Sequence, residues 1–196
     1  MFLETICIAN GIVQDIEAHR ERMRETASHF GFRAPQLPDL VARLSTELRN
    51  KRVKCSVTYH EHILGTAFAE YQQREIHSLK LIETEQLDYA FKYSDRSALH
   101  ALLQKRGDCD EILIVQDGHI TDTSFSNVIF RKGGAYFTPC TCLLNGIKRQ
   151  RLLRAGRIRE AEITVSDLHL FETVHLINAM LDIEDGVTLP VANIAR

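Results

Sequence analysis

The sequence lacks the features of a membrane-spanning or secreted protein. It has no apolar run of about eighteen residues. Its start, MFLETICIANGIVQD, has neither a basic segment followed by an apolar core nor a small-residue cleavage site. Only five of the 196 residues are cysteines, and this odd, scattered set does not suit a disulfide framework. We therefore expect a soluble, cytoplasmic protein with reduced thiols and no membrane partner.

A strong excess of charge of either sign is also missing. The 24 Lys and Arg residues nearly balance the 26 Asp and Glu residues, and the net charge is −2. No global field would therefore attract nucleic acid. The most basic segment, KRQRLLRAGRIR at 148–159, has no interleaved aromatic residues and carries leucines suited to a core. We expect no nucleic-acid partner, which leaves a small molecule as the default.

Metal-ligating residues at regular spacing are absent as well. Cys140 and Cys142 form the only local cysteine pair in the sequence, and neither His119 nor His169 supplies a partner at ligand spacing. A zinc site normally needs four such ligands. We expect no metal.

The first part of the chain has the patterns of a small α+β lobe. Asn10-Gly11 predicts a tight hairpin turn between two strands. Helix formers at 17–30 predict a helix that ends at Gly31, and apolar spacing predicts a second helix at 38–50. Between residues 53 and 84, β-branched and alternating residues predict antiparallel strands.

The remainder favours a β-rich lobe with helices. A helix is expected after Ser94 or Asp95, followed by a four-stranded meander with turns at 117–118 and 133–134. A further helix opens at 145–146, and a strand, a short helix and a strand complete the chain. We see no internal repeat. We place the lobe boundary so that residues 1–85 form the N-terminal α+β lobe and residues 86–196 the C-terminal, cofactor-binding lobe.

The second lobe contains three features that suit one cofactor. They are Lys92 in an apparent strand, Asp122 in ITDTSFSN, and a helix N-terminus emerging from LLNGIK. Pyridoxal 5'-phosphate (PLP) needs an amine for its aldehyde, an anion for its ring nitrogen and N–H donors for its phosphate. The pattern therefore predicts a PLP site.

The order of these motifs is similar to that of a known family. KYSDR, ITDTSFSNVIF, LLNGIKRQRLL and HLINAM, preceded by FLETICIANG and HRERM, resemble the class IV aminotransferases, which are PLP enzymes of fold type IV. That family includes branched-chain and D-amino-acid aminotransferases and aminodeoxychorismate lyase. The resemblance implies a two-lobed α+β fold with a small N-terminal α/β sandwich lobe and a C-terminal, antiparallel-rich β lobe with helices. It also implies a homodimer.

The resemblance assigns the reactive groups. Lys92 matches the lysine that attaches covalently to the cofactor aldehyde and later moves a proton at the substrate α-carbon. Asp122 matches the acidic residue that keeps the ring nitrogen protonated, where the family often has the longer glutamate. Without the accompanying motifs, Lys92 would be interpreted as an exposed strand-edge charge and Asp122 as a turn cap.

The same resemblance assigns the phosphate contacts. Gly146 and Ile147 match the phosphate-binding turn, and Arg22 matches an arginine that reaches the phosphate from the first lobe. Lys148 stands where several relatives have threonine. Its side chain either adds a cation to the phosphate or leaves the site and contributes only its amide.

Other positions favour a lyase. Thr5 falls where lyases of the family have threonine, and its hydroxyl is suited to relay a proton to the departing pyruvate unit. Arg96, four residues after Lys92, and the pair Asn178 and Ala179 in INAM also resemble the lyase pattern. We assign these positions to substrate binding.

The sequence thus predicts a lyase resembling 4-amino-4-deoxychorismate lyase. Such an enzyme acts on a small amino compound, gives 4-aminobenzoate and pyruvate, and serves folate biosynthesis. Two alternatives stay open: a branched-chain or D-amino-acid aminotransferase on the same fold, and a non-catalytic interaction module. Cys7 stands where many relatives have an arginine. A module would need none of Lys92, Asp122 and Arg22.

Overall fold

The computed structural model describes residues 1–85 and 87–196 and divides into two compact units. Unit 1 comprises Met1–Gln73 and Phe91–Asp95, and unit 2 comprises Arg74–Ala90 and Arg96–Arg196. The lobe boundary expected between residues 85 and 86 falls on residue 86, which lies outside the described residues, so that boundary stays a prediction.

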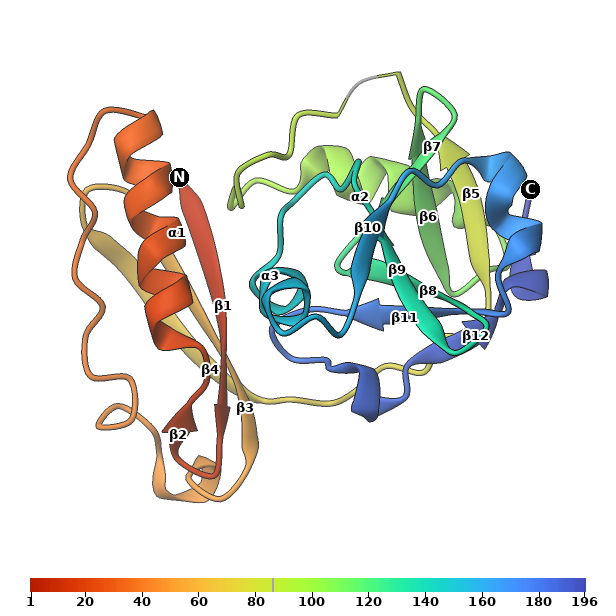
Figure 1. Cartoon of the computed structure of the whole chain (residues 1–196). Helices are drawn as coiled ribbons and strands as arrows, with labels where there is room; N and C mark the ends of the chain where they lie inside the picture. Colours follow the sequence, from red (N-terminus) through yellow and green to blue (C-terminus); the bar gives the residue numbers. More distant parts are fainter. Residues whose placement is uncertain (86) are drawn as a thin grey trace. The chain divides into compact units, whose positions relative to one another are not determined.

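Unit 1 is a four-stranded antiparallel sheet with one helix against it (Figure 1). The strand order is β2-β1-β3-β4. The elements are β1 (Phe2–Ala9), β2 (Ile12–Val13), α1 (Ile16–His29), β3 (Arg52–Tyr59) and β4 (Ile63–Glu70). The predicted turn is confirmed, since Asn10 and Gly11 have φ of 50° and 73°. Helix α1 confirms the helix expected at 17–30.

Strand β1 alternates between a buried and a less buried face. Phe2, Glu4 and Ile6 point to the buried face, whereas Leu3 and Thr5 are only half-buried. Aromatic and sulfur-containing side chains from β1, α1 and β3 share one cluster, made by Phe2, Met23 and Tyr59. The period of two therefore directs Glu4 toward α1, in a largely apolar environment.

The prediction of a second helix at 38–50 is wrong. This part of the chain contains only a 3-10 helix at Thr46–Leu48. The Asp39 carboxylate accepts hydrogen bonds from the amides of Val41 and Ala42, which starts a turn instead of an α-helix. The apolar spacing is still used, because Leu40 and Leu44 are buried in the core of unit 1.

Unit 2 contains two sheets and two α-helices among its described residues (Figure 1). One sheet has the order β13-β5-β6-β7, from β5 (Leu79–Glu83), β6 (Glu111–Gln116), β7 (His119–Thr123) and β13 (Ile194–Ala195). The other has the order β10-β9-β8-β11-β12, from β8 (Asn127–Lys132), β9 (Ala135–Pro139), β10 (Arg159–Ala161), β11 (Thr173–Ile177) and β12 (Thr188–Pro190). The helices are α2 (Ser97–Leu103) and α3 (Ile147–Arg154).

The four predicted strands between residues 111 and 140 exist, but they do not form one meander. Strands β6 and β7 belong to one sheet, and β8 and β9 to the other. Strand β5 is also not antiparallel as expected, since it pairs parallel with β6. The parallel pairing of β5 with β6 and the antiparallel pairing of β8 with β11 join segments distant in sequence, which local alternation does not encode.

The chain changes sheets at a tight loop, Ser124–Phe125–Ser126. The Thr123 amide donates to the Ser126 carbonyl at 2.9 Å, and the Ser126 amide donates to the Thr123 hydroxyl at 3.0 Å. These bonds hold the end of β7 near the start of β8. As a result, Asp122 of β7 and Asn127 of β8 are brought close together.

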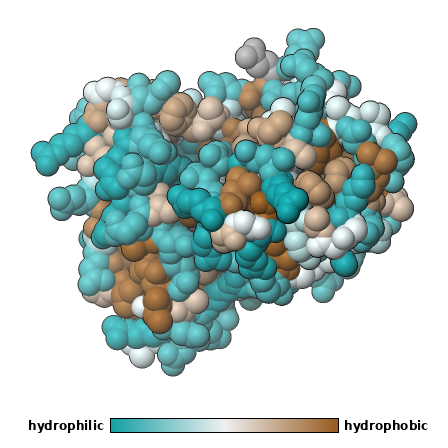
Figure 2. Space-filling model, in the orientation of Figure 1, coloured by the Kyte–Doolittle hydropathy of each residue, from teal (hydrophilic) through white to brown (hydrophobic). Residues whose placement is uncertain are grey.

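No helix within the described residues is long and apolar enough to cross a membrane. The face in Figure 2 is mainly hydrophilic, with separate hydrophobic patches. Large apolar side chains with high exposure include Ile12 at 66% and Leu64 at 56%. Scattered exposure of this kind is normal for a folded chain.

Candidate functional site

Asp122 is a buried carboxylate with a defined set of donors. Its side chain accepts hydrogen bonds from Asn127 Nδ2 at 2.8 Å and from the Leu144 amide at 3.0 Å, one on each oxygen. Burial raises the pKa of Asp122 to about 6, although these hydrogen bonds oppose the rise. Each carboxylate oxygen has a second lone pair, so the group is able to accept a further N–H.

Helix α3 begins directly after the loop that contacts Asp122. Gly146 is its N-cap and, as a glycine, has no side chain to cap the first turn. The amides of Ile147 and Lys148 lie at the start of the helix, where the dipole favours an anion. The structure therefore brings Asp122 and the predicted phosphate turn together within unit 2.

The Lys148 side chain contacts another residue instead of extending the turn. Its Nζ donates to Asp182 at 2.7 Å, and Arg151 also pairs with Asp182. Burial alone would raise the pKa of Asp182, but the Lys148 hydrogen bond and the Ile183 amide lower it to about 2. In this structure the Lys148 side chain therefore contacts Asp182, and the role of its backbone amide in the phosphate turn stays a prediction.

Arg22 belongs to a buried ion cluster in unit 1. Its Nε and Nη2 donate to the two oxygens of Glu4 at 2.8 and 2.5 Å, and His19 Nδ1 lies 2.5 Å from Glu4 Oε2. Burial would raise the pKa of Glu4, but Arg22 and His19 lower it to about 2. The Nε and Nη2 atoms of Arg22, which we expected to reach the phosphate, therefore contact Glu4 in this structure.

Lys92 does not lie on a strand, which corrects the expectation. It occupies an irregular segment of unit 1, where its carbonyl accepts from the Leu3 amide at 2.9 Å and Tyr93 forms a bridge to Phe2. Phe91 and Tyr93 pack on the aromatic cluster at the start of β1. These contacts anchor the residues on both sides of the half-buried Lys92, which explains the aromatic neighbours in the sequence.

Thr5 is also in unit 1. It pairs with Ser56 of β3 and is half-buried on the sheet face opposite to Glu4. The hydroxyl is therefore separated from the Glu4 ion cluster by the sheet.

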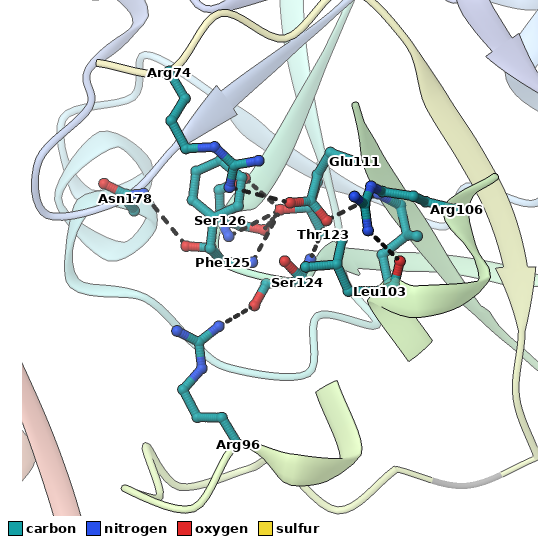
Figure 3. Close-up of polar contacts among 11 residues, drawn as sticks. Arg74, Arg96, Leu103, Arg106, Glu111, Thr123, Ser124, Phe125, Ser126 and Asn178 are labelled. Atoms are coloured by element: carbon teal, nitrogen blue, oxygen red, sulfur yellow. Dashed lines mark hydrogen bonds and ion pairs between the residues drawn. The ribbon is translucent and has the colours of Figure 1, made fainter. Parts of the chain in front are cut away.

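Two predicted substrate residues converge on the Ser124–Phe125–Ser126 loop (Figure 3). Arg96 Nη2 donates to the Ser124 carbonyl at 2.5 Å, and Asn178 Nδ2 donates to the Phe125 carbonyl at 3.3 Å. The buried Glu111 also accepts from the Ser124 amide at 3.4 Å. In the structure, Arg96 and Asn178 thus hold backbone that follows Asp122 by only two or three residues.

The INAM segment forms a turn around Asn178. Asn178 and Leu181 exchange backbone hydrogen bonds of 3.1 and 3.0 Å, and Asn178 Oδ1 accepts from the Met180 amide at 2.8 Å. Ala179 lies within this turn. Because both ends of the Asn178 amide are used, its side chain has a fixed orientation toward the loop.

The sequence matches the Amino-transferase class IV family over residues 1–185. The chain belongs to this family. Members of the family are PLP enzymes, and the α+β fold of the chain matches structures of fold type IV.

Three proteins illustrate the similarity. An uncharacterized protein from Haemophilus influenzae is 37% identical over 180 residues, which cover 90% of this chain and 96% of that protein. A crystal structure named "putative 4-amino-4-deoxychorismate lyase" from Haemophilus somnus is 32% identical, with a TM-score of 0.82, covering 91% of this chain and 95% of that chain. A hypothetical aminotransferase from Mycobacterium tuberculosis in its PLP-bound form is 17% identical, with a TM-score of 0.74, covering 91% and 77%. The last likeness concerns the fold alone.

The residues of unit 2 fit the family cofactor. A buried carboxylate and an uncapped helix N-terminus offer the two kinds of group that a pyridinium and a phosphate require. Asp122 would hold the ring nitrogen, and the amides after Gly146 would hold the phosphate. No group of three or more His, Cys, Asp and Glu in residues 1–85 and 87–196 is placed to bind a metal ion.

Sequence reasoning missed two residues that contact predicted site residues, Glu4 beside Arg22 in unit 1 and Asn127 beside Asp122 in unit 2. Glu4 was not singled out, although its place among alternating buried residues of β1 is a signal that a buried acid needs a cationic partner. Asn127 was not singled out either, although it is the last residue of the motif ITDTSFSN that contains Asp122. Only the turn between β7 and β8 shows that its amide reaches Asp122.

Proposed function

We propose that this protein is a PLP-dependent lyase that converts 4-amino-4-deoxychorismate into 4-aminobenzoate and pyruvate. The single observation that carries the cofactor part is Asp122, a buried carboxylate hydrogen-bonded to the loop that enters the uncapped helix α3. The similarity to the Haemophilus somnus structure, over nearly the full length of both chains, supports the choice of substrate.

The bound cofactor would supply an electron sink for the bonds at the substrate α-carbon. Lys92 would hold the cofactor through its amine and would move a proton at the substrate α-carbon. Asp122 would accept the ring N–H, and the amides of Ile147 and Lys148, which follow Gly146, would bind the phosphate. Thr5 delivers a proton to the methylene carbon of the departing pyruvate unit.

Aminotransferase activity on a branched-chain or D-amino acid is the second candidate. A crystal structure named "putative amino-acid aminotransferase" from Mesorhizobium loti, 21% identical, has a TM-score of 0.71 and is covered to 94% by this chain, so a protein of similar size that carries this name shares the fold. Thr5 favours the lyase, because transamination requires no proton donor to a leaving pyruvate unit. Arg96 and the Asn178-Ala179 pair favour it only through their resemblance to the lyase pattern.

The test compares two reactions in PLP-saturated protein. One assay follows pyruvate release from 4-amino-4-deoxychorismate, and the other follows glutamate formation from an amino acid and 2-oxoglutarate. Pyruvate without glutamate supports the lyase, and glutamate without pyruvate supports the aminotransferase. Thr5→Ser and Thr5→Ala extend the test. We expect the serine variant to retain pyruvate release and the alanine variant to lose at least about 100-fold, as expected for a lost proton donor.

Lys92→Ala is the control for covalent attachment. The wild-type protein should keep a visible band after dialysis and give a PLP adduct on Lys92 after borohydride reduction, and the variant should do neither. A wild-type protein that stays colourless with added PLP would favour the non-catalytic module. We also propose a homodimer, which light scattering during size-exclusion chromatography tests directly.

A further inference from the structure

Asn127 occupies the centre of a closed hydrogen-bond ring in unit 2. Its Nδ2 donates to Asp122 at 2.8 Å and to the Leu144 carbonyl at 2.8 Å. The Leu144 amide donates back to the other oxygen of Asp122 at 3.0 Å. Asn127 is only 6% exposed, so this ring is shielded from water. The ring joins the carboxylate of β7 to the loop that leads into α3.

Asn127 also packs directly against the N-cap of α3. A Cβ atom at Gly146 would lie 2.1 Å from Asn127 Oδ1, which is far below a van der Waals contact. Gly146 has φ of −65°, an angle that any residue adopts, so its backbone does not require glycine. Glycine is required at position 146 because the Asn127 side chain leaves no space for a Cβ atom.

The chemistry of the position is specific for a primary amide. One nitrogen carries two hydrogens and here serves two acceptors, a carboxylate and a carbonyl. An aspartate of the same shape would offer no donor and would place a second carboxylate beside Asp122. Asn127 begins β8 and pairs with Ile177 of β11, so its backbone is fixed within a sheet.

We propose that Asn127 is a positioning residue that sets the separation between Asp122 and the phosphate turn at Gly146. This inference rests on the proposed function, in which those two elements bind opposite ends of one cofactor. Because the ring nitrogen and the phosphate belong to one molecule, their two anchors must keep a fixed spacing to act together. Asn127 contacts both anchors, Asp122 and the turn at Gly146. It therefore allows the two anchors to bind one cofactor molecule cooperatively.

The test measures dissociation constants for PLP and for pyridoxal, which lacks the phosphate, by absorbance titration. We compare wild type with Asn127→Ala and Asn127→Asp. Asn193→Ala is the matched control, because its amide also donates to a carbonyl, that of His77, but at an exposed site. We expect both Asn127 variants to weaken PLP binding about tenfold or more, the loss expected for a hydrogen bond to a charged group. The control should stay within about twofold of wild type.

The decisive readout is the ratio of PLP to pyridoxal affinity. Loss of spacing between the anchors removes the advantage that the phosphate gives, so the ratio should fall about tenfold in Asn127→Ala. An equal loss for both probes would mean that Asn127 only supports the fold, which overturns the proposal. If Asn127→Ala does not fold, Asn127→Ser replaces it. Failure of both to fold, judged by circular dichroism, counts against positioning as well.

A double-variant cycle tests the contact with Gly146. Gly146→Ala alone should weaken PLP binding about as much as Asn127→Ala, and the double variant should be no weaker than either single variant. If the double variant instead lost PLP affinity by the product of the two single-variant losses, the contact between Asn127 and Gly146 would be refuted. Different results would contradict the proposed function and the proposed role of Asn127. A wild-type protein that never binds PLP contradicts the proposed function. A wild-type protein that binds PLP, but no better than its Asn127 variants, contradicts only the positioning role of Asn127.

Discussion

The buried Glu4 carboxylate makes a prediction that depends on pH. Glu4 is fully buried between Arg22 and His19, and its pKa is lowered from an ordinary 4.5 to about 2. These values differ by about 2.5, and one pKa unit corresponds to about 1.4 kcal/mol, so the ionised form adds about 3 kcal/mol to the free energy of unfolding. Because the folded pKa is depressed, this stability is present above pH 4.5 and is lost as pH falls toward 2.

Replacing Glu4 by Gln isolates this contribution. Glutamine resembles the protonated acid, so Glu4→Gln should lower the free energy of unfolding at pH 7 by about 3 to 5 kcal/mol, because it leaves the charge of Arg22 buried without its anion. The difference in free energy of unfolding between wild type and Glu4→Gln should then become smaller as pH falls. Proton linkage at Glu4 predicts that this difference decreases by about 2 kcal/mol between pH 7 and pH 3.

Urea denaturation followed by far-UV circular dichroism at pH 7, 5, 4 and 3 measures this gap. Glu21→Gln is the matched control on the same helix, because Glu21 pairs with Arg24 on the surface, with side-chain exposures of 57% and 55%. We expect that control to differ little from wild type at every pH. A gap for Glu4→Gln that stays constant from pH 7 to pH 3 would refute the assigned ionisation.

Three further predictions concern unit 2. Lys148→Met should lower the free energy of unfolding by about 1 to 3 kcal/mol, because it breaks the bond to Asp182. In a titration, its PLP affinity should stay within about twofold of wild type, because the side chain contacts Asp182 and we expect only the amide to bind the phosphate. A tenfold loss of PLP affinity without destabilisation would contradict this. PLP affinity should fall as pH drops from 7 to 5, because Asp122 with a pKa of about 6 gains a proton; Asp122→Asn should bind about tenfold more weakly and lose that dependence. Arg96→Ala should expose the loop at Ser124 to limited proteolysis, whereas unchanged cleavage would remove Arg96 from loop support.

Much of the candidate site could be predicted because its residues lie in short, ordered motifs. Asp122 is four residues ahead of the SN pair, and Gly146 stands at the start of a helix, so local patterns place each on its element. The partners of those residues could not be predicted. Lys148 reaches Asp182, which is 34 positions away in sequence, and no periodicity encodes such a pair.

By itself, the sequence determined the local elements and the order of the chemical groups. Alternation produced β1 and β3, Asn10-Gly11 produced the hairpin turn, and the motif order identified the family. Turn and strand chemistry acts over a few residues, which is why it can be read without a fold.

Only the tertiary structure decided which groups meet. The change of sheet after β7 brings Asn127 to Asp122, and the same arrangement places the Leu144 amide on that carboxylate. These contacts arise because a buried polar atom must find a partner wherever the packed chain supplies one, at any distance along the sequence.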